Sequence, residues 1–164
     1  MKSAPQLLVL VGVPGCGKST WCQQVQRHGY QVVSTDRIRK QIWSSLRSAN
    51  SELQPFNNEI VFTHFHLSLR ARLAAGANVI ADATNLTQQS RTQLLDLADE
   101  YKAQTKFIVF DNSKARKYNQ QRAADIVVPA EVMDKMEVLY QQAIQELRDS
   151  SAEVIDSEKF LRCF

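Results

Sequence analysis

The stretch of sequence that most constrains this chain is an apolar run that passes directly into a glycine-rich loop. Residues 7–11 read Leu-Leu-Val-Leu-Val, and residues 12–20 read Gly-Val-Pro-Gly-Cys-Gly-Lys-Ser-Thr. A continuous apolar run of this length is typical of a parallel strand that is buried on both faces. Residues 20–28 then have the composition of a helix, which Gly29 would end. The segment therefore predicts a strand, a tight loop and a helix in that order.

The loop matches the pattern G-x-x-x-x-G-K-[ST] of a phosphate-binding loop. Glycines let main-chain N–H groups point inward at phosphate oxygens, and the next helix directs its positive dipole end toward them. We therefore expect ATP and Mg²⁺ to bind here, with Lys18 on the β- and γ-phosphates and the Ser19 hydroxyl as a magnesium ligand. The residues expected to contact the triphosphate are Gly12, Pro14, Gly15, Cys16, Gly17, Lys18, Ser19 and Thr20.

Composition places few further demands on the chain. Its 164 residues predict one domain, residues 1–164, and its 44% hydrophobic and 23% charged residues are ordinary for a globular protein. No apolar run approaches the ~20 residues of a membrane span, so we expect no membrane association. The three cysteines lack zinc-site spacing and predict free thiols in a reducing cytoplasm. The net charge of +3 permits a nucleic-acid partner without favouring one.

The five glycines exclude one class of nucleotide-binding protein. None of them lies three residues after an aspartate, so the D-x-x-G switch of signalling GTPases is absent, and so is N-K-x-D. The sequence therefore excludes a signalling GTPase.

Further strands and helices alternate along the rest of the chain. The predicted strands are residues 30–34, 78–81, 106–110 and 153–155, and the predicted helices are residues 36–47, 56–75, 87–102, 113–124 and 129–147. Residues 48–55 are polar and rich in turn formers. Such alternation predicts an α/β fold, a three-layer P-loop NTPase domain with a parallel sheet of about five strands and helices on both faces.

Charged residues follow three of the predicted strands. Asp36 comes after the second strand, with Arg39 one turn further on the same helix face, and Asp82 ends the third strand. Arg116 and Arg122 belong to a basic segment after the fourth. Carboxyl ends of parallel strands meet at one edge, and phosphoryl transfer requires cations together with a carboxylate that accepts the proton of the attacking hydroxyl.

Simpler interpretations of these charged residues stay open at this point. Asp36 could serve only as a helix N-cap, Asp82 could be a turn residue, and the basic segment could be a solvated helix face. Trp43 shares a helix face with Asp36 and Arg39, and could either line an acceptor site or pack at the edge of the domain.

Three segments in order resemble the kinase domain of the polynucleotide 5′-hydroxyl kinase family. They are residues 12–20, residues 34–39 with Thr-Asp-x-x-Arg, and residues 80–86 with Asp-Ala-Thr-Asn. The resemblance continues through Asn119-x-x-Arg122 and through the later positions Val128, Pro129, Val132 and Met136.

The resemblance implies roles for the charged residues. Asp36 would be the general base on the acceptor hydroxyl, and Arg39 would contact the acceptor phosphate or the active-site carboxylates. Asp82 would organise the site and join Ser19 as a candidate magnesium ligand. Arg122 would be the arginine of a helical lid, residues 112–128, and would contact the triphosphate.

The resemblance has one departure, and it leaves the acceptor open. Tyr118 stands where the family often has a second lid arginine, and Arg116 lies two residues from that position. No part of the sequence resembles the phosphatase or ligase modules that accompany many relatives. The expected acceptor is a nucleic-acid 5′-hydroxyl. The alternatives are a small hydroxyl metabolite or nucleoside, and an ATP-binding switch without an acceptor.

Overall fold

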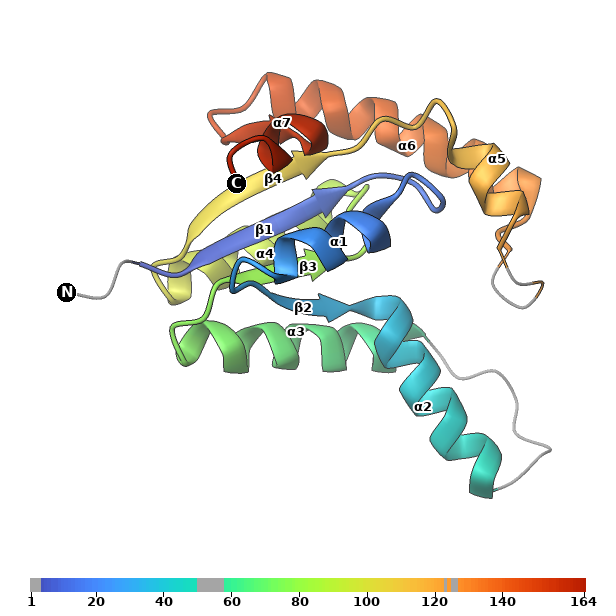
Figure 1. Ribbon diagram of the computed structural model, residues 1–164, viewed down its shortest axis with the longest axis horizontal. Helices are drawn as coiled ribbons and strands as arrows, with labels where there is room; N and C mark the ends of the chain where they lie inside the picture. Colours follow the sequence, from blue (N-terminus) through green and yellow to red (C-terminus); the bar gives the residue numbers. More distant parts are fainter. Residues whose placement is uncertain (1–3, 50–57, 123, 125–126) are drawn as a thin grey trace.

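A five-stranded parallel sheet forms the centre of the protein (Figure 1). The computed structural model describes residues 4–49, 58–122, 124 and 127–164, with the side chains of residues 46–49 left out. The strands lie in the order β2-β3-β1-β4-β5. Their bounds are β1 Gln6–Val11, β2 Gln31–Ser34, β3 Val79–Asp82, β4 Gln104–Val109 and β5 Val154–Asp156.

Helices cover both faces of this sheet. The side chains of α3, α4 and α6 form one buried cluster with the sheet, and those of α1 and α7 form a second cluster with its other face. The helix bounds are α1 Lys18–Gln26, α2 Thr35–Ala49, α3 Asn58–Ala74, α4 Gln88–Glu100, α5 Ala115–Gln120, α6 Ala130–Arg148 and α7 Ser157–Leu161. The predicted three-layer α/β architecture is therefore confirmed.

Strand β1 shows why the apolar run is continuous. Leu7, Val9 and Val11 pack into the cluster with α3, α4 and α6, whereas Leu8 and Leu10 pack into the cluster with α1 and α7. All five are fully buried because successive side chains of a strand point to opposite faces and both faces are covered. This strand fixes the start of the glycine-rich loop at the carboxyl edge of the sheet.

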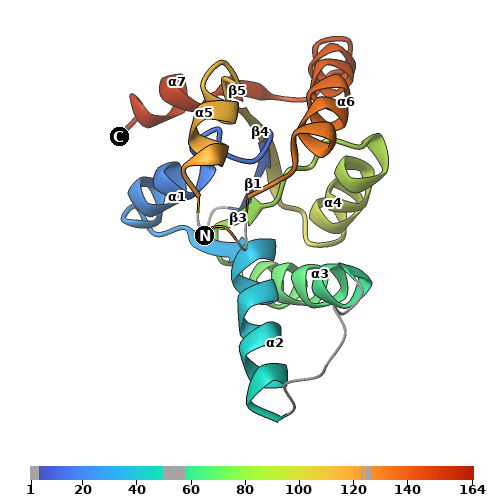
Figure 2. The ribbon, with the colours of Figure 1, turned by 90° about the vertical axis from the view of Figure 1, so that its right-hand side faces the viewer.

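The elements differ from the predicted ones mainly at their ends. Helix α5 is shorter than the predicted helix over residues 113–124, and α7 was not predicted at all. All of the predicted turn-rich stretch 48–55 differs from the prediction or falls outside the described residues: residues 48 and 49 belong to α2, and residues 50–55 lie outside the described part. Helix α2 projects away from the sheet (Figure 2), which leaves much of its surface to solvent.

The arrangement brings the carboxyl ends of β1, β2 and β3 together, with α5 and the start of α2 at the same end of the molecule (Figure 1). Ligands of open α/β sheets bind at this edge. Within the described residues, none of the helices is both long enough and apolar enough to span a bilayer.

Candidate active site

The glycine-rich loop after β1 has the backbone shape that the motif requires. Gly15 and Gly17 have φ values of 86° and 99°, a region that side chains other than glycine rarely adopt. A Cβ atom at Gly15 would meet the carbonyl oxygen of Ala115 and lie 2.9 Å from the amide nitrogen of Asn119. The loop therefore packs directly against α5, and only glycine permits this approach.

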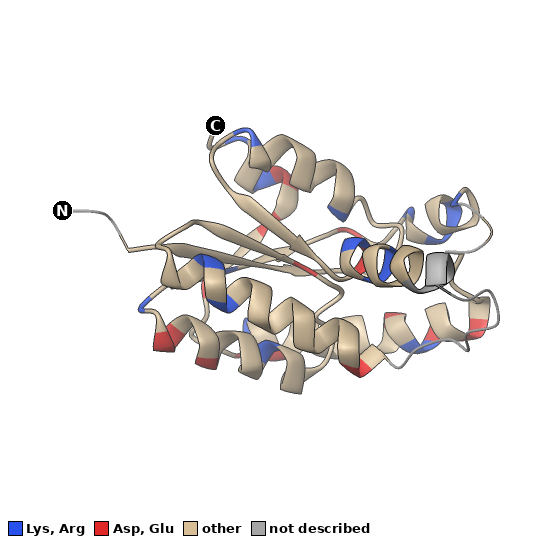
Figure 3. Ribbon diagram, turned by 90° about the horizontal axis from the view of Figure 1, so that it is seen from below, with Lys and Arg blue, Asp and Glu red and all other residues tan. Residues whose placement is uncertain are grey.

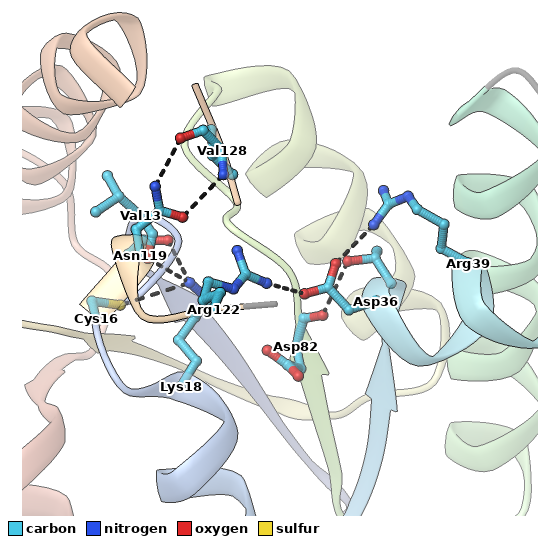
Figure 4. Close-up of polar contacts among 11 residues, drawn as sticks. Val13, Cys16, Lys18, Asp36, Arg39, Asp82, Asn119, Arg122 and Val128 are labelled. Carbon is cyan, nitrogen blue, oxygen red and sulfur yellow. Dashed lines mark hydrogen bonds and ion pairs between the residues drawn. The ribbon is translucent and has the colours of Figure 1, made fainter. Parts of the chain in front are cut away.

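Lys18 lies folded over this loop (Figure 4). Its ammonium donates to the carbonyl oxygens of Gly12 at 2.8 Å and Val13 at 2.9 Å. Ser19 and Thr20 are exposed on the first turn of α1, where main-chain N–H groups lack helical partners. The loop thus presents a cation and a helix N-terminus side by side, which is the arrangement that binds phosphate.

The Asp36 carboxylate meets two arginines at the carboxyl edge: Arg39, one turn further along α2, and Arg122, from a distant part of the chain (Figure 4). The Asp36 carboxylate accepts from Arg39 at 2.7 Å and from Arg122 at 3.4 Å. Arg39 also donates to the side-chain oxygen of Asn58 at 3.1 Å, which ties α2 to α3. The Asp36 side chain stays 59% exposed, so it is held in place yet open to a ligand.

Asp82 lies at the end of β3, buried between the loop and α2. Burial raises the pKa of the Asp82 carboxyl, and the nearby charge of Asp36 raises it further, whereas Lys18 and a hydrogen bond from Ser34 lower it. The hydroxyl of Thr35 donates to the Asp82 carbonyl oxygen at 3.5 Å. A carboxylate in this position is incompletely compensated by the protein, and a bound cation would stabilise it.

Arg116 lies apart from this group. Its guanidinium donates to Glu137 at 2.8 Å and to Asp134 at 2.5 Å, and both acceptors belong to α6. Tyr118, at the position of the second lid arginine, is 47% exposed. In this structure, Arg122 is the arginine of the basic segment that reaches Asp36, and Arg116 instead joins α5 to α6.

Asp36 belongs to the first turn of α2, which begins at Thr35. Trp43 is half-buried on this helix.

No group of three or more His, Cys, Asp or Glu side chains that could enclose a metal occurs in the part of the chain that the structure describes.

Three polar residues near the site had no role assigned from the sequence. The Asn119 amide donates to the Val128 carbonyl oxygen at 2.8 Å and accepts from the Val128 N–H at 3.1 Å (Figure 4). Asn85 and Arg91 are buried behind the loop and bind main-chain carbonyls. Asn119 and Asn85 lie within the motif segments, which could have indicated their importance. The sequence gives no indication that Arg91 is buried, because a single arginine in an amphipathic helix is usually a surface residue.

A family model described as an AAA domain matches residues 7–143. The chain belongs to the AAA domain family. Residues 7–143 run from β1 into α6, so the matched region contains the glycine-rich loop and all of the site residues described above.

Two relatives of this AAA domain protein carry the polynucleotide kinase resemblance. A protein of Autographa californica nuclear polyhedrosis virus, described as a bifunctional polynucleotide kinase/RNA ligase, is 32% identical over 100 residues, 55% of this chain and 14% of the viral protein. A chain in the structure of the Pnkp1/Rnl/Hen1 RNA repair complex is 28% identical with a TM-score of 0.71, over 89% of this chain and 47% of that one. These findings confirm the resemblance, and this chain spans less than half the length of either relative.

A gluconokinase from Sinorhizobium meliloti 1021 shares the fold, with 18% identity, a TM-score of 0.52 and coverage of 97% of this chain and 86% of the gluconokinase. At this identity the likeness concerns the fold alone. The kinases among the relatives support the expectation that the AAA domain of this chain is a kinase.

Proposed function

We propose that this chain transfers the γ-phosphate of ATP to a hydroxyl group of an acceptor. The observation that carries the proposal is the Asp36 carboxylate, 59% exposed, held by Arg39 and reached by Arg122 at the same sheet edge as the phosphate-binding loop. A nucleotide-driven switch requires a positioned water, whereas a kinase requires a base directed at the substrate hydroxyl. An exposed, oriented carboxylate favours the kinase.

The transfer assigns a step to each of these side chains. The acceptor oxygen attacks the γ-phosphorus, the bond from that phosphorus to the oxygen bridging to ADP breaks, and the hydroxyl proton passes to Asp36. Lys18 and Arg122 offset the charge of the transferred group. Arg39 keeps Asp36 oriented through the 2.7 Å contact.

Magnesium fits the oxygen donors at the edge of the sheet. The hydroxyl of Ser19 on the first turn of α1 and the carboxylate of Asp82 are the residues that would hold it, because both are hard oxygen ligands. The ion would neutralise charge on the phosphates. The buried, incompletely compensated carboxylate of Asp82 supports this assignment.

Residues 112–128 would act as the lid of the site. The described part of this segment is anchored at Ala115, which is fully buried, and at Asn119, which binds Val128. Arg122 extends from the end of this anchored part toward Asp36. On triphosphate binding, Arg122 would exchange the carboxylate for phosphate oxygens, and the segment would close over the phosphates.

The acceptor we favour is the 5′-hydroxyl of a polynucleotide. Two relatives are described as a polynucleotide kinase/RNA ligase and as part of an RNA repair complex. Figure 3 shows Lys and Arg on the helices at the site end of the molecule, where they would meet a phosphate backbone. A small hydroxyl metabolite or nucleoside is the second candidate, favoured by the engagement of Arg116 with α6, which removes one cation from the site.

A transfer screen tests both the chemistry and the acceptor. Labelled ATP and Mg²⁺ would be offered with 5′-hydroxyl oligonucleotides, nucleosides and small alcohols. We expect transfer to the oligonucleotides, its loss in Lys18→Ala, and a loss of at least ~10²-fold in Asp36→Asn with ATP binding retained.

Each contrary outcome of the screen has a separate meaning. Full activity in Asp36→Asn would remove the base assignment. Transfer only to a small alcohol would leave the kinase and replace the acceptor. ATP hydrolysis with no transfer to any acceptor would favour a switch.

A further inference from the structure

Asn85 is buried just behind the proposed active site, and the proposed chemistry gives it no role. It lies three residues after Asp82, is 4% exposed, and has a φ of 47°. Asparagine tolerates this left-handed conformation better than most side chains, although glycine adopts it at less cost. A residue chosen only for the turn could therefore be glycine, and the asparagine side chain needs its own explanation.

The Asn85 amide joins two strands. Its nitrogen donates to the carbonyl oxygen of Leu10 in β1 at 2.7 Å and lies 3.3 Å from that of Ala81 in β3. A main-chain bond runs alongside, from the N–H of Gly12 to the carbonyl oxygen of Thr84 at 3.2 Å. The loop that follows Asp82 is therefore bonded both to the end of β1, at Leu10, and to the first residue of the phosphate-binding loop, Gly12.

These bonds lie where the sheet itself no longer connects the two strands. The register between β1 and β3 pairs Leu7 with Val79, Leu8 with Ile80, and Val9 with Ala81. The phosphate-binding loop and Asp82 both come after the last of these pairs. The distance between loop and carboxylate is thus set beyond the ladder, at the place where the Asn85 side chain acts.

Arg91 of α4 holds the same loop from behind. Its guanidinium, 4% exposed as a residue, donates to the carbonyl oxygens of Asn85 at 3.0 Å and Leu86 at 2.8 Å. It also pairs with Glu146 of α6. Because a buried cation is costly without partners, these contacts give Arg91 a defined position and restrain the loop.

We propose that Asn85, supported by Arg91, is a positioning residue that sets the phosphate-binding loop relative to Asp82. It acts through main-chain groups and touches neither nucleotide nor acceptor. The inference rests on the proposed function, since it names the residue that aligns the transferred phosphate with the carboxylate side of the site. A misplacement of ~1 Å at a reacting centre lowers a rate by roughly 10²-fold, so the alignment is worth a large share of the rate.

Asn85→Gly separates this role from the turn, because glycine keeps the left-handed backbone and removes only the amide. The matched control is Asn78→Ala, whose side-chain oxygen accepts from the N–H of Gln6 at 2.9 Å and joins the same two segments at the opposite edge. Both variants lose a side-chain bond to the main chain of β1. The measurements are kcat, the KM for ATP, ATP affinity by direct titration, and the melting temperature.

We expect Asn85→Gly to lower kcat by at least ~10-fold with less than a ~3-fold change in KM and ATP affinity. Asn78→Ala should lower the melting temperature comparably and leave kcat within ~3-fold of wild type. Arg91→Lys, which retains the charge but loses the fork, should lower kcat in the same direction and provides a second measurement if Asn85→Gly does not fold.

Equal kcat losses in Asn85→Gly and Asn78→Ala, or unchanged kcat in Asn85→Gly, would overturn the inference. If the wild-type chain binds ATP but transfers phosphate to no acceptor, the proposed function fails instead. The positioning role is then measured from acceptor-independent ATP hydrolysis, in which Asn85→Gly should again be slower than Asn78→Ala.

Discussion

At the scale of single residues, the buried carboxylate of Asp82 lowers the stability of the folded protein at neutral pH. Burial is the largest influence on this group and raises its pKa, and the attraction of Lys18 only partly opposes the effect. The folded chain therefore binds this proton more tightly than the unfolded chain does. The contribution of Asp82 to stability is greatest below the unfolded pKa and falls as the pH rises through the folded pKa.

Asp82→Asn should accordingly raise the melting temperature of the nucleotide-free protein at pH 7. The asparagine side chain has nearly the same shape as aspartate but carries no charge to be buried. Each kcal/mol relieved corresponds to roughly 2–4 °C for a domain of this size. The gain should shrink as the pH is lowered toward the ordinary carboxyl pKa of 3.8. Thermal unfolding of both proteins across pH measures it.

Asp36→Asn is the matched control, since the Asp36 side chain is 59% exposed and its ion pairs lie near the surface. Such pairs contribute about 0–1 kcal/mol, so its melting temperature should change little. A lower melting temperature in Asp82→Asn at pH 7 would show that Lys18 more than compensates the buried charge.

At the scale of elements, α7 completes the layer that carries the phosphate-binding helix. The indole N–H of Trp21 in α1 donates to the Ser157 carbonyl oxygen at 2.9 Å, and the ring of Phe160 lies 5.5 Å from that of Trp21. Tyr30 also packs edge-on against Phe160. Five residues are too few for helical periodicity to appear in the sequence, which explains why α7 was not predicted.

Phe160→Ala should therefore lower the free energy of unfolding by about 3–5 kcal/mol, the range for removing a buried aromatic ring. Phe160 is 6% exposed, whereas Phe164, which stacks on His28, is 53% exposed. Phe164→Ala should cost ~1 kcal/mol or less. Denaturant unfolding of the two variants measures the difference, and equal losses would mean that α7 is not packed as described.

The clamp between Asn119 and Val128 makes a second prediction at this scale. Its two hydrogen bonds tie Val128, the last residue of the proposed lid segment 112–128, to α5. Asn119→Ala should speed hydrogen exchange of the Val128 amide, which loses its acceptor. In the wild type, a non-hydrolysable ATP analogue should add protection to α5 and its flanks if the lid closes. No added protection would contradict closure.

At the scale of the whole molecule, the site is assembled from segments that follow four different strands, and its cations come from several of them. Lys18 begins α1, Arg39 belongs to α2, and Arg122 follows α5. The net charge is only +3, so attraction for the proposed polynucleotide acceptor would come from these local cations rather than from the charge of the whole molecule.

A polynucleotide acceptor should therefore bind in a salt-dependent way. With two or three backbone phosphates contacted by Lys or Arg, the KM of a 5′-hydroxyl oligonucleotide should rise roughly 7–20-fold between 50 and 200 mM salt. A nucleoside acceptor, which has no backbone phosphate, serves as the comparison and should show little change. Equal salt dependence for both would contradict backbone recognition.

The sequence by itself determined the α/β order, the buried central strand and the phosphate-binding loop. These features depend on neighbours along the chain: a continuous apolar run, glycines at fixed spacing and a helix directly after them. It also predicted that Asp36 and Arg39 share a helix face, because a turn of helix sets that spacing.

Only the tertiary structure decided which distant side chains meet. Arg122 reaches Asp36 across 86 residues, whereas Arg116, six residues earlier, pairs with α6 instead. Asn85 and Arg91 are buried polar residues that donate to main-chain carbonyls, and Arg91 also pairs with Glu146 from a distant helix. Carbonyls occur at every position and leave no trace in the sequence, so such contacts follow only from how the strands and helices pack.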